Sequence, residues 1–213
     1  MNIAKQLRTA VVLTLVLCVV TGLLYPGLVT AAAQLIFPRQ ANGSLVEVDG
    51  RVVGSELVGQ SFTQPWYFQG RPSAAGAGYD GAASSGTNKG PTDAKLAATV
   101  TERVDSAVAQ TGVAKGAVPS DMVTASASGL DPHISPANAR LQVARVAKAR
   151  GVDSSAIAVI LERQVEGRQF GVLGEARVNV LLLNIALDSL LPRPTAPADT
   201  TPAVDTTTAQ RNP

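Results

Sequence analysis

The chain has 213 residues, of which 46% are hydrophobic and 16% charged, with a net charge of +2, one histidine and one cysteine. From residue 38 to residue 191, basic and acidic side chains are equal in number. This balance provides no basic surface of the kind that binds nucleic acid, so that class of partner is excluded. The length suffices for one soluble domain and an additional segment.

The additional segment lies at the N-terminus. No charged side chain occurs between Thr9 and Phe37, a long apolar run that contains Pro26-Gly27. About 20 apolar residues cross the ~30 Å hydrocarbon core of a bilayer, so residues 9–37 predict a transmembrane helix. Pro26-Gly27 is expected to kink or end the regular helix, which membrane helices tolerate.

The charges that flank this run predict its orientation. Lys5, Arg8 and the terminal amine precede it, whereas the nearest cation after it is Arg39. Because cytoplasmic flanks tend to be the more basic, residues 1–8 are expected in the cytoplasm and the following domain outside. A cleaved signal peptide is the alternative, since Ala31–Ala33 offers a cleavage site. The run exceeds the roughly 7–15 apolar residues of a signal peptide, which favours a retained span.

Residues 38–191 predict a single extracytoplasmic domain of the α+β class. Its first element is a hairpin at Ser44–Val53, because two valine-containing runs flank Asp49-Gly50, a strong turn signal. Met122–Ala125 is expected to form a short strand. Four helices are expected, at residues 91–110, 136–150, 154–165 and 178–191. The last is apolar but too short for a second span, so we expect it in the core.

Residues 192–213 form the predicted tail. They consist mainly of Pro, Thr and Ala with few charges and no apolar periodicity. Such a segment buries too little surface to offset the entropy of ordering, so we expect it to be disordered.

The single histidine, His133, lies close to Asp131, Ser126 and Ser128. Nucleophilic catalysis needs a serine held by a base that a carboxylate orients, and residues within one turn do not promise this geometry. We therefore interpret Asp131-Pro132 as a turn that leads into a helix, with His133 satisfying the helix end. No catalytic residue and no metal site is expected, because one histidine and a cysteine in the span leave only carboxylates. Neither a G-x-x-x-x-G-K-[ST] loop nor an Asp-Lys-Thr-Gly motif occurs.

Three further segments occur in a characteristic order along the chain. They are GQSFTQPWYFQGRPSAAGAGYD at residues 59–80, VPSDMVTASASGLDPHISPANARLQVARVAKARG at 118–151 and LGEARVNVLLLNIALD at 173–188. With the N-terminal span, they resemble the KdpC family from about Lys5 to Leu191. The resemblance implies a non-catalytic, single-pass subunit of the Kdp potassium-transporting ATPase. It implies as partners a channel-like potassium-conducting subunit, a P-type ATPase subunit and a small hydrophobic subunit.

The resemblance also implies a role in assembly and in raising the ATP affinity of the ATPase subunit, as a catalytic chaperone. The family carries a loop similar to Ser-Gly-Gly-Ser-Asn, which is compared with the signature of ATP-binding cassettes. Its counterpart here gives five candidate nucleotide-binding residues, namely Ser84, Ser85, Gly86, Thr87 and Asn88. Ser85 replaces a glycine and lacks its freedom at positive φ, which weakens the case for direct contact. ATP is then held only in a ternary complex with the ATPase subunit, and no tightly bound cofactor is implied.

An aromatic triplet, Trp66, Tyr67 and Phe68, gives the candidate contacts with a partner subunit. Aromatic anchors supply much of the binding energy of protein interfaces. A core cluster is the alternative interpretation of the same residues. For the whole chain, a secreted hydrolase or binding module released near Ala33 remains the alternative function.

Overall fold

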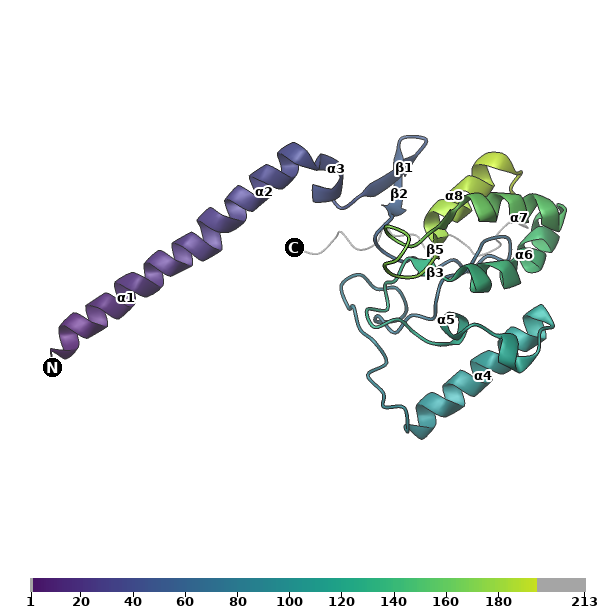
Figure 1. Cartoon of the computed structure of the whole chain (residues 1–213), viewed down its shortest axis with the longest axis horizontal. Helices are drawn as coiled ribbons and strands as arrows, with labels where there is room; N and C mark the ends of the chain where they lie inside the picture. Colours follow the sequence, from purple (N-terminus) through teal and green to yellow (C-terminus); the bar gives the residue numbers. More distant parts are fainter. Residues whose placement is uncertain (1, 195–213) are drawn as a thin grey trace, which may run out of the picture.

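The computed structural model describes residues 2–194, and its N-terminal part is one long helix that projects away from the folded domain (Figure 1). The helix comprises α1 (Ile3–Val19), a π-helical turn (Val20–Leu24) and α2 (Tyr25–Ile36). Its 34 residues extend about 50 Å at 1.5 Å per residue, which exceeds the ~30 Å hydrocarbon core. None of its residues is buried against the rest of the chain. Among the described residues it is the one helix long and apolar enough to cross a membrane.

The regular α-helix is interrupted one turn earlier than expected. The N–H group of Tyr25 donates to the carbonyl of Val20, five residues back, which is the π-helical pattern. Pro26 has no N–H group, and its ring crowds the carbonyls of the turn before it, where the wider π turn lies. Of the two predicted outcomes, the helix does not end at Pro26-Gly27, because α2 continues through both residues to Ile36; the regular α-helix is interrupted by the π turn directly before them.

A short helix and a hairpin connect the span to the domain. The helix is α3 (Pro38–Ala41), and the antiparallel strands are β1 (Leu45–Val48) and β2 (Arg51–Ser55). Asp49 and Gly50 form the turn between them, with φ of 51° and 75°. A turn with both central residues at positive φ matches the twist of the strands, so the predicted hairpin is confirmed.

The domain contains a three-stranded antiparallel sheet in the order β3-β5-β4. Its strands are β3 (His133–Ile134), β5 (Arg177–Asn179) and β4 (Val165–Glu166). The helices around it are α4 (Ala94–Thr111), α5 (Ser120–Val123), α6 (Pro136–Arg150), α7 (Ser154–Arg163) and α8 (Val180–Leu190). A 3₁₀ turn, Lys115–Ala117, joins α4 to α5. The predicted architecture, an N-terminal apolar helix followed by an α+β domain, is confirmed.

Local signals account for the helix ends. The Ser135 Oγ accepts a hydrogen bond from the Asn138 N–H (3.1 Å) at the start of α6, and Gly151 ends that helix at φ +67°. At the start of α7, the Asp153 carboxylate accepts from the Ser155 N–H (2.7 Å). These helices therefore begin and end within a few residues of the predicted positions.

Two predictions about these elements are wrong. Residues 122–125 were expected as a strand, but Met122 and Val123 belong to α5. Val178 was expected to start the last helix, yet it pairs with Ile134 and Val165 in the sheet, so α8 begins at Val180.

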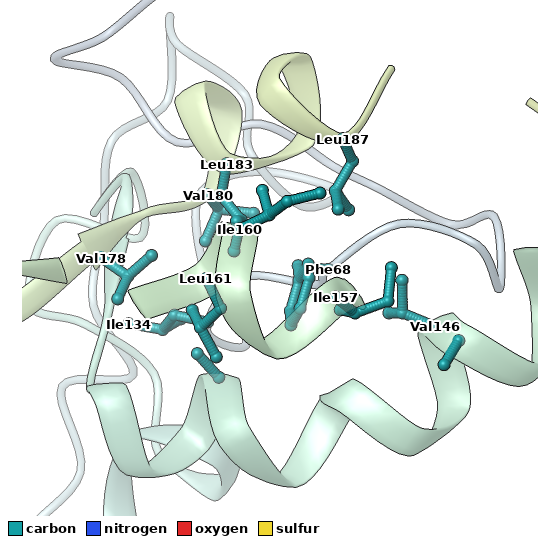
Figure 2. Packing of buried hydrophobic residues seen from close by; sticks show 12 residues of the cluster. Phe68, Ile134, Val146, Ile157, Ile160, Leu161, Val178, Val180, Leu183 and Leu187 are labelled. Carbon is teal, nitrogen blue, oxygen red and sulfur yellow. The ribbon is translucent and has the colours of Figure 1, made fainter. Parts of the chain in front are cut away.

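The core lies where α6, α7 and α8 meet the sheet, with Phe68 packed among them (Figure 2). Its largest members are Phe68, Ile134, Val146, Ile157, Leu161, Val178, Leu183 and Leu187, each at most 2% exposed. The prediction that the last helix is a core helix is confirmed, since Leu183 and Leu187 of α8 are fully buried. Most of the predicted tail, from residue 195 to 213, lies outside the described residues.

Candidate interaction sites

The candidate nucleotide loop, Ser84–Asn88, lies against the turn at Ser126–Gly129. The Ser84 Oγ and the Ser85 N–H both donate to the carbonyl of Ser128, each at 3.0 Å. A side chain on Gly86 would approach the Ala127 carbonyl to 2.8 Å, so the two segments are in close contact. The loop is thus positioned by backbone contacts with a segment more than forty residues away in the sequence.

The substitution of Ser85 for a glycine does not strain this loop. Among the described residues of the loop, Asn88 has a positive φ, at 51°, and Ser85 does not. The expected conflict between serine and a glycine-specific backbone therefore does not arise. Asparagine tolerates the left-handed region better than most residues, so the sequence suits the backbone at both positions.

The helix that follows the loop is a poor phosphate site. Phosphates bind at helix N-termini through free N–H groups. At the start of α4 the Asp93 carboxylate already accepts from the N–H groups of Lys95 (2.8 Å) and Leu96 (3.0 Å). The hydrogen bond from Leu96, with that from Lys89, lowers the pKa of Asp93, so this end of the helix holds a negative charge. Nucleotide contact by the loop stays a prediction.

The aromatic triplet divides into one core residue and two half-buried residues. Phe68 is fully buried in the core, and Asn184 of α8 holds its backbone. The Asn184 Oδ1 accepts from the Phe68 N–H (2.8 Å), and the Asn184 Nδ2 donates to the Phe68 carbonyl (2.9 Å). Phe68 therefore has no exposed surface for a partner, and the predicted contact is corrected to Trp66 and Tyr67.

Tyr67 belongs to a polar cluster with Arg150 and Asp188. The Tyr67 hydroxyl donates to Asp188 Oδ2 (2.6 Å), and Arg150 Nη2 donates to Asp188 Oδ1 (2.8 Å). The Arg150 side chain is fully buried, and its guanidinium carbon lies 5.4 Å from the Tyr67 ring centroid. Burial, together with the hydrogen bond to Asp188, raises the pKa of Tyr67. A buried cation, a carboxylate and a phenol thus interact directly, although Arg150 Nη1 is buried without a hydrogen-bond partner among the described residues.

The charge on Asp188 is stabilised by its donors. Burial alone would raise the pKa of this carboxyl group, but hydrogen bonds from Arg193, Tyr67 and Arg150 outweigh it and lower the pKa. Sequence reasoning did not identify this cluster. The available signal was the presence of Asn184 and Asp188 in an otherwise apolar helix, because polar groups in a buried helix need partners.

A groove of about 550 Å³ lies beside Tyr67, between the β1–β2 hairpin and α8. Its apolar wall consists of Val48, Val53, Phe62, Leu181 and Ile185. From α6, Arg145 donates to the carbonyls of Pro65 (2.7 Å) and Tyr67 (3.1 Å), and Arg150 donates to that of Trp66 (2.8 Å), while Asn184 of α8 holds Phe68. Residues 65–68 are therefore held from both α6 and α8.

His133 begins strand β3, directly after a turn at Asp131-Pro132, and does not form a triad. The Asp131 Oδ1 accepts from the His133 N–H (3.0 Å), and the Asp131 Oδ2 accepts from Arg71 Nη1 (3.1 Å). The Ser128 Oγ accepts from the Leu130 N–H, so it too serves the turn. Burial raises the pKa of Asp131, but the hydrogen bonds from His133 and Arg71 outweigh it and lower the pKa. Ser135, not His133, satisfies the helix start, so that detail of the prediction is wrong.

Within residues 2–194, no group of three or more His, Cys, Asp or Glu side chains is placed to hold a metal ion. The polar side chains of the candidate sites instead join distant segments of the chain to one another. The fold and these sites define a class of protein, namely an α+β domain preceded by a single helix that is long and apolar enough to cross a membrane.

Comparison with known proteins identifies the family. The sequence model of the KdpC family, described as "K+-transporting ATPase, c chain", matches residues 7–189. The chain therefore belongs to the KdpC family.

Relatives named potassium-transporting ATPase KdpC subunit match almost the whole chain. The one from Gemmatimonas aurantiaca is 63% identical over 187 residues, which are 87% of this chain and 94% of that relative. The one from Myxococcus xanthus is 60% identical over 183 residues, or 85% of each chain. The one from Methylococcus capsulatus is 54% identical over 187 residues, covering 87% and 98%. These relatives do not support the secreted hydrolase that the sequence left open.

Proposed function

We propose that this chain is the non-catalytic C subunit of a high-affinity, ATP-driven potassium uptake complex. The observation that carries the proposal is the 63% identity with a potassium-transporting ATPase KdpC subunit over 94% of that relative's length. The partners are then a channel-like potassium-conducting subunit, a P-type ATPase subunit and a small hydrophobic subunit. The chain assists assembly of this complex and raises the ATP affinity of its ATPase subunit.

Trp66 and Tyr67 are the side chains proposed to contact a partner. Both are half-buried, and Tyr67 lines the groove between the hairpin and α8. Arg145 and Arg150 hold their carbonyls, and Asn184 holds the backbone of the adjacent Phe68, so little conformational entropy remains to be lost when a partner binds. This rigidity supports a docking role for the exposed parts of the two rings.

Co-purification tests the proposed function. The tagged full-length chain is isolated from a detergent extract of its own cells, and the bound proteins are identified by mass spectrometry. All three proposed partners should be enriched relative to a matched sample in which residues 1–37 are replaced by a cleavable signal peptide. Recovery of the chain without any of the three would contradict the proposal.

The domain is proposed to lie outside the cytoplasm, with the N-terminus inside. The basic residues Lys5 and Arg8 before the span support this orientation. ATP is cytosolic, so the effect on ATP affinity then passes through the complex as a coupling free energy between distant sites. The capping of α4 by Asp93, which occupies the N–H groups closest to the candidate loop, supports this indirect route.

Labelling of a cysteine at Thr87 separates direct from indirect action. Thr87 is exposed, so Thr87→Cys in a Cys18→Ser background gives a single accessible thiol. A membrane-impermeant maleimide should label it in intact cells, or in spheroplasts where an outer membrane is present. Labelling only after lysis would place Ser84–Asn88 in the cytoplasm, reverse the proposed topology and favour direct nucleotide contact.

A further inference from the structure

An exposed apolar loop tip stands out among the features that the proposed function does not use. The segment between β4 and β5 carries Phe170, Val172 and Leu173, which are 91%, 72% and 57% exposed. Phe170 is more exposed than any other large hydrophobic side chain of residues 2–194, those of the membrane span included. Water-exposed clusters of this kind mark surfaces that contact a membrane or another molecule.

The tip is held rigidly by its own backbone. Gln169 and Leu173 exchange two hydrogen bonds, each 2.9 Å long, which close a tight loop around Phe170. Phe170 has a φ of +53°, a region that few aromatic residues adopt. The backbone hydrogen bonds thus fix the loop, and its apolar side chains face the solvent and not the core.

Two ion pairs join the segments on either side of the tip, residues 166–168 and 175–177, which form its stem. Arg168 Nη2 donates to the Glu175 carboxylate (2.7 Å), and Arg177 Nε donates to Glu166 Oε2 (2.9 Å). The stem is therefore polar but electrically neutral. An apolar tip next to a polar stem with arginine side chains is the arrangement of segments that insert into the headgroup region of a bilayer.

The base of this stem is joined to the connector that follows the membrane span. Asn179, at the end of β5, donates through Nδ2 to the Glu56 carbonyl (2.7 Å). The Glu56 side chain accepts from Arg39 Nη2 (2.6 Å) in α3, three residues after the last residue of α2. In Figure 1 the green loop between α7 and β5 lies at the edge of the domain that is turned toward the α1–α2 helix. The loop is thus linked to the point where the chain leaves the membrane.

We propose that the tip formed by Phe170, Val172 and Leu173 inserts into the lipid interface on the side of the membrane where the domain lies. The span and the tip then hold the domain at two points and fix its orientation on the bilayer surface. A lipid occupant is favoured over a protein, because stable protein interfaces take roughly 20–30 residues a side and this tip offers three apolar side chains. The proposal rests on the membrane anchor and not on the role in potassium uptake.

Depth-dependent quenching in lipid nanodiscs tests the proposal with the full-length chain. In a Cys18→Ser background, Val172→Cys carries an environment-sensitive fluorophore, and Ser154→Cys at the start of α7 carries the same label as a control. Nanodiscs of phosphatidylcholine and phosphatidylglycerol contain lipids with a quencher near the top of the acyl chain. The label at residue 172 should show a blue-shifted emission and several-fold stronger quenching than the label at residue 154.

Two variants of the exposed residue make the result specific. Phe170→Asp should abolish most of the quenching at residue 172, whereas Phe170→Leu should retain it, and neither change touches the buried core. Equal quenching at residues 172 and 154 would overturn the proposal, as would full quenching in Phe170→Asp. Shielding of residue 172 that appears only with the partner subunits, without lipid quenching, would also overturn it and identify a protein contact.

Discussion

Replacing Asn184 by leucine should destabilise the domain strongly, although the two side chains are similar in size. Asn184 is 2% exposed and satisfies both the N–H and the carbonyl of Phe68, which lie in the apolar core. Asn184→Leu leaves these two backbone groups buried without a partner. Each such group costs about 1–3 kcal/mol, so the free energy of unfolding should fall by roughly 2–6 kcal/mol. For a chain of this size, at roughly 2–4 °C for each kcal/mol, that lowers the unfolding midpoint by roughly 4–24 °C.

The fluorescence of Trp66 provides the assay. It is the only tryptophan of the chain and lies two residues from Phe68, so its emission reports on the segment that Asn184 holds. Unfolding of the full-length protein in detergent is followed by denaturant titration. Gln110→Leu is the matched control, because it removes an exposed amide whose partner is Ser106, and it should change stability by less than about 0.5 kcal/mol. An Asn184→Leu protein as stable as this control would refute the reasoning.

Three further predictions concern other parts of the chain. The lowered pKa of Asp188 means that its charge stabilises the fold above about pH 4, and that this contribution is lost as the pH falls through the folded-state pKa. Asp188→Asn should therefore be less stable at neutral pH and lose less stability on acidification, as measured by denaturant titrations across pH. Gly129 has a φ of +67°, and an added Cβ would approach the Ala75 nitrogen to 2.6 Å. Gly129→Ala should cost more than about 1 kcal/mol, whereas Gly116→Ala, with open space around it, should be neutral in the same assay. Truncation after Pro194 should leave co-purification with the partners unchanged, since the missing segment has no apolar anchors. Loss of assembly would identify that segment as a docking element.

The elements that the sequence predicts well are those specified by a few neighbouring residues. Ser135 and Asp153 cap helices through hydrogen bonds that span two or three residues, and Asp49-Gly50 sets the turn of its hairpin. The sequence does not decide whether Phe68 lies in the core or at an interface, because its burial depends on Asn184, which lies 116 residues further along the chain. A local pattern does not distinguish a core aromatic residue from an interface residue when its partner is so distant.

The candidate sites, too, could be predicted where they depend on neighbouring residues and could not where they depend on distant ones. The five residues of the Ser84–Asn88 loop were identified from a resemblance, but their packing against Ser128 was not foreseeable from either segment alone. No pattern in the sequence distinguishes the buried Arg150 from the other residues of the helix predicted at 136–150. Its role became visible only when the fold placed Tyr67 and Asp188 around it. Long-range polar contacts of this kind leave little trace in the sequence of one chain.

Growth at limiting potassium tests the central claim most directly. The gene for this chain is deleted in a cell that depends on this uptake system for high-affinity potassium import. Growth should be abolished at micromolar potassium, and it should be restored either by the intact gene or by an excess of potassium. Normal growth of the deletion strain at micromolar potassium would contradict the account.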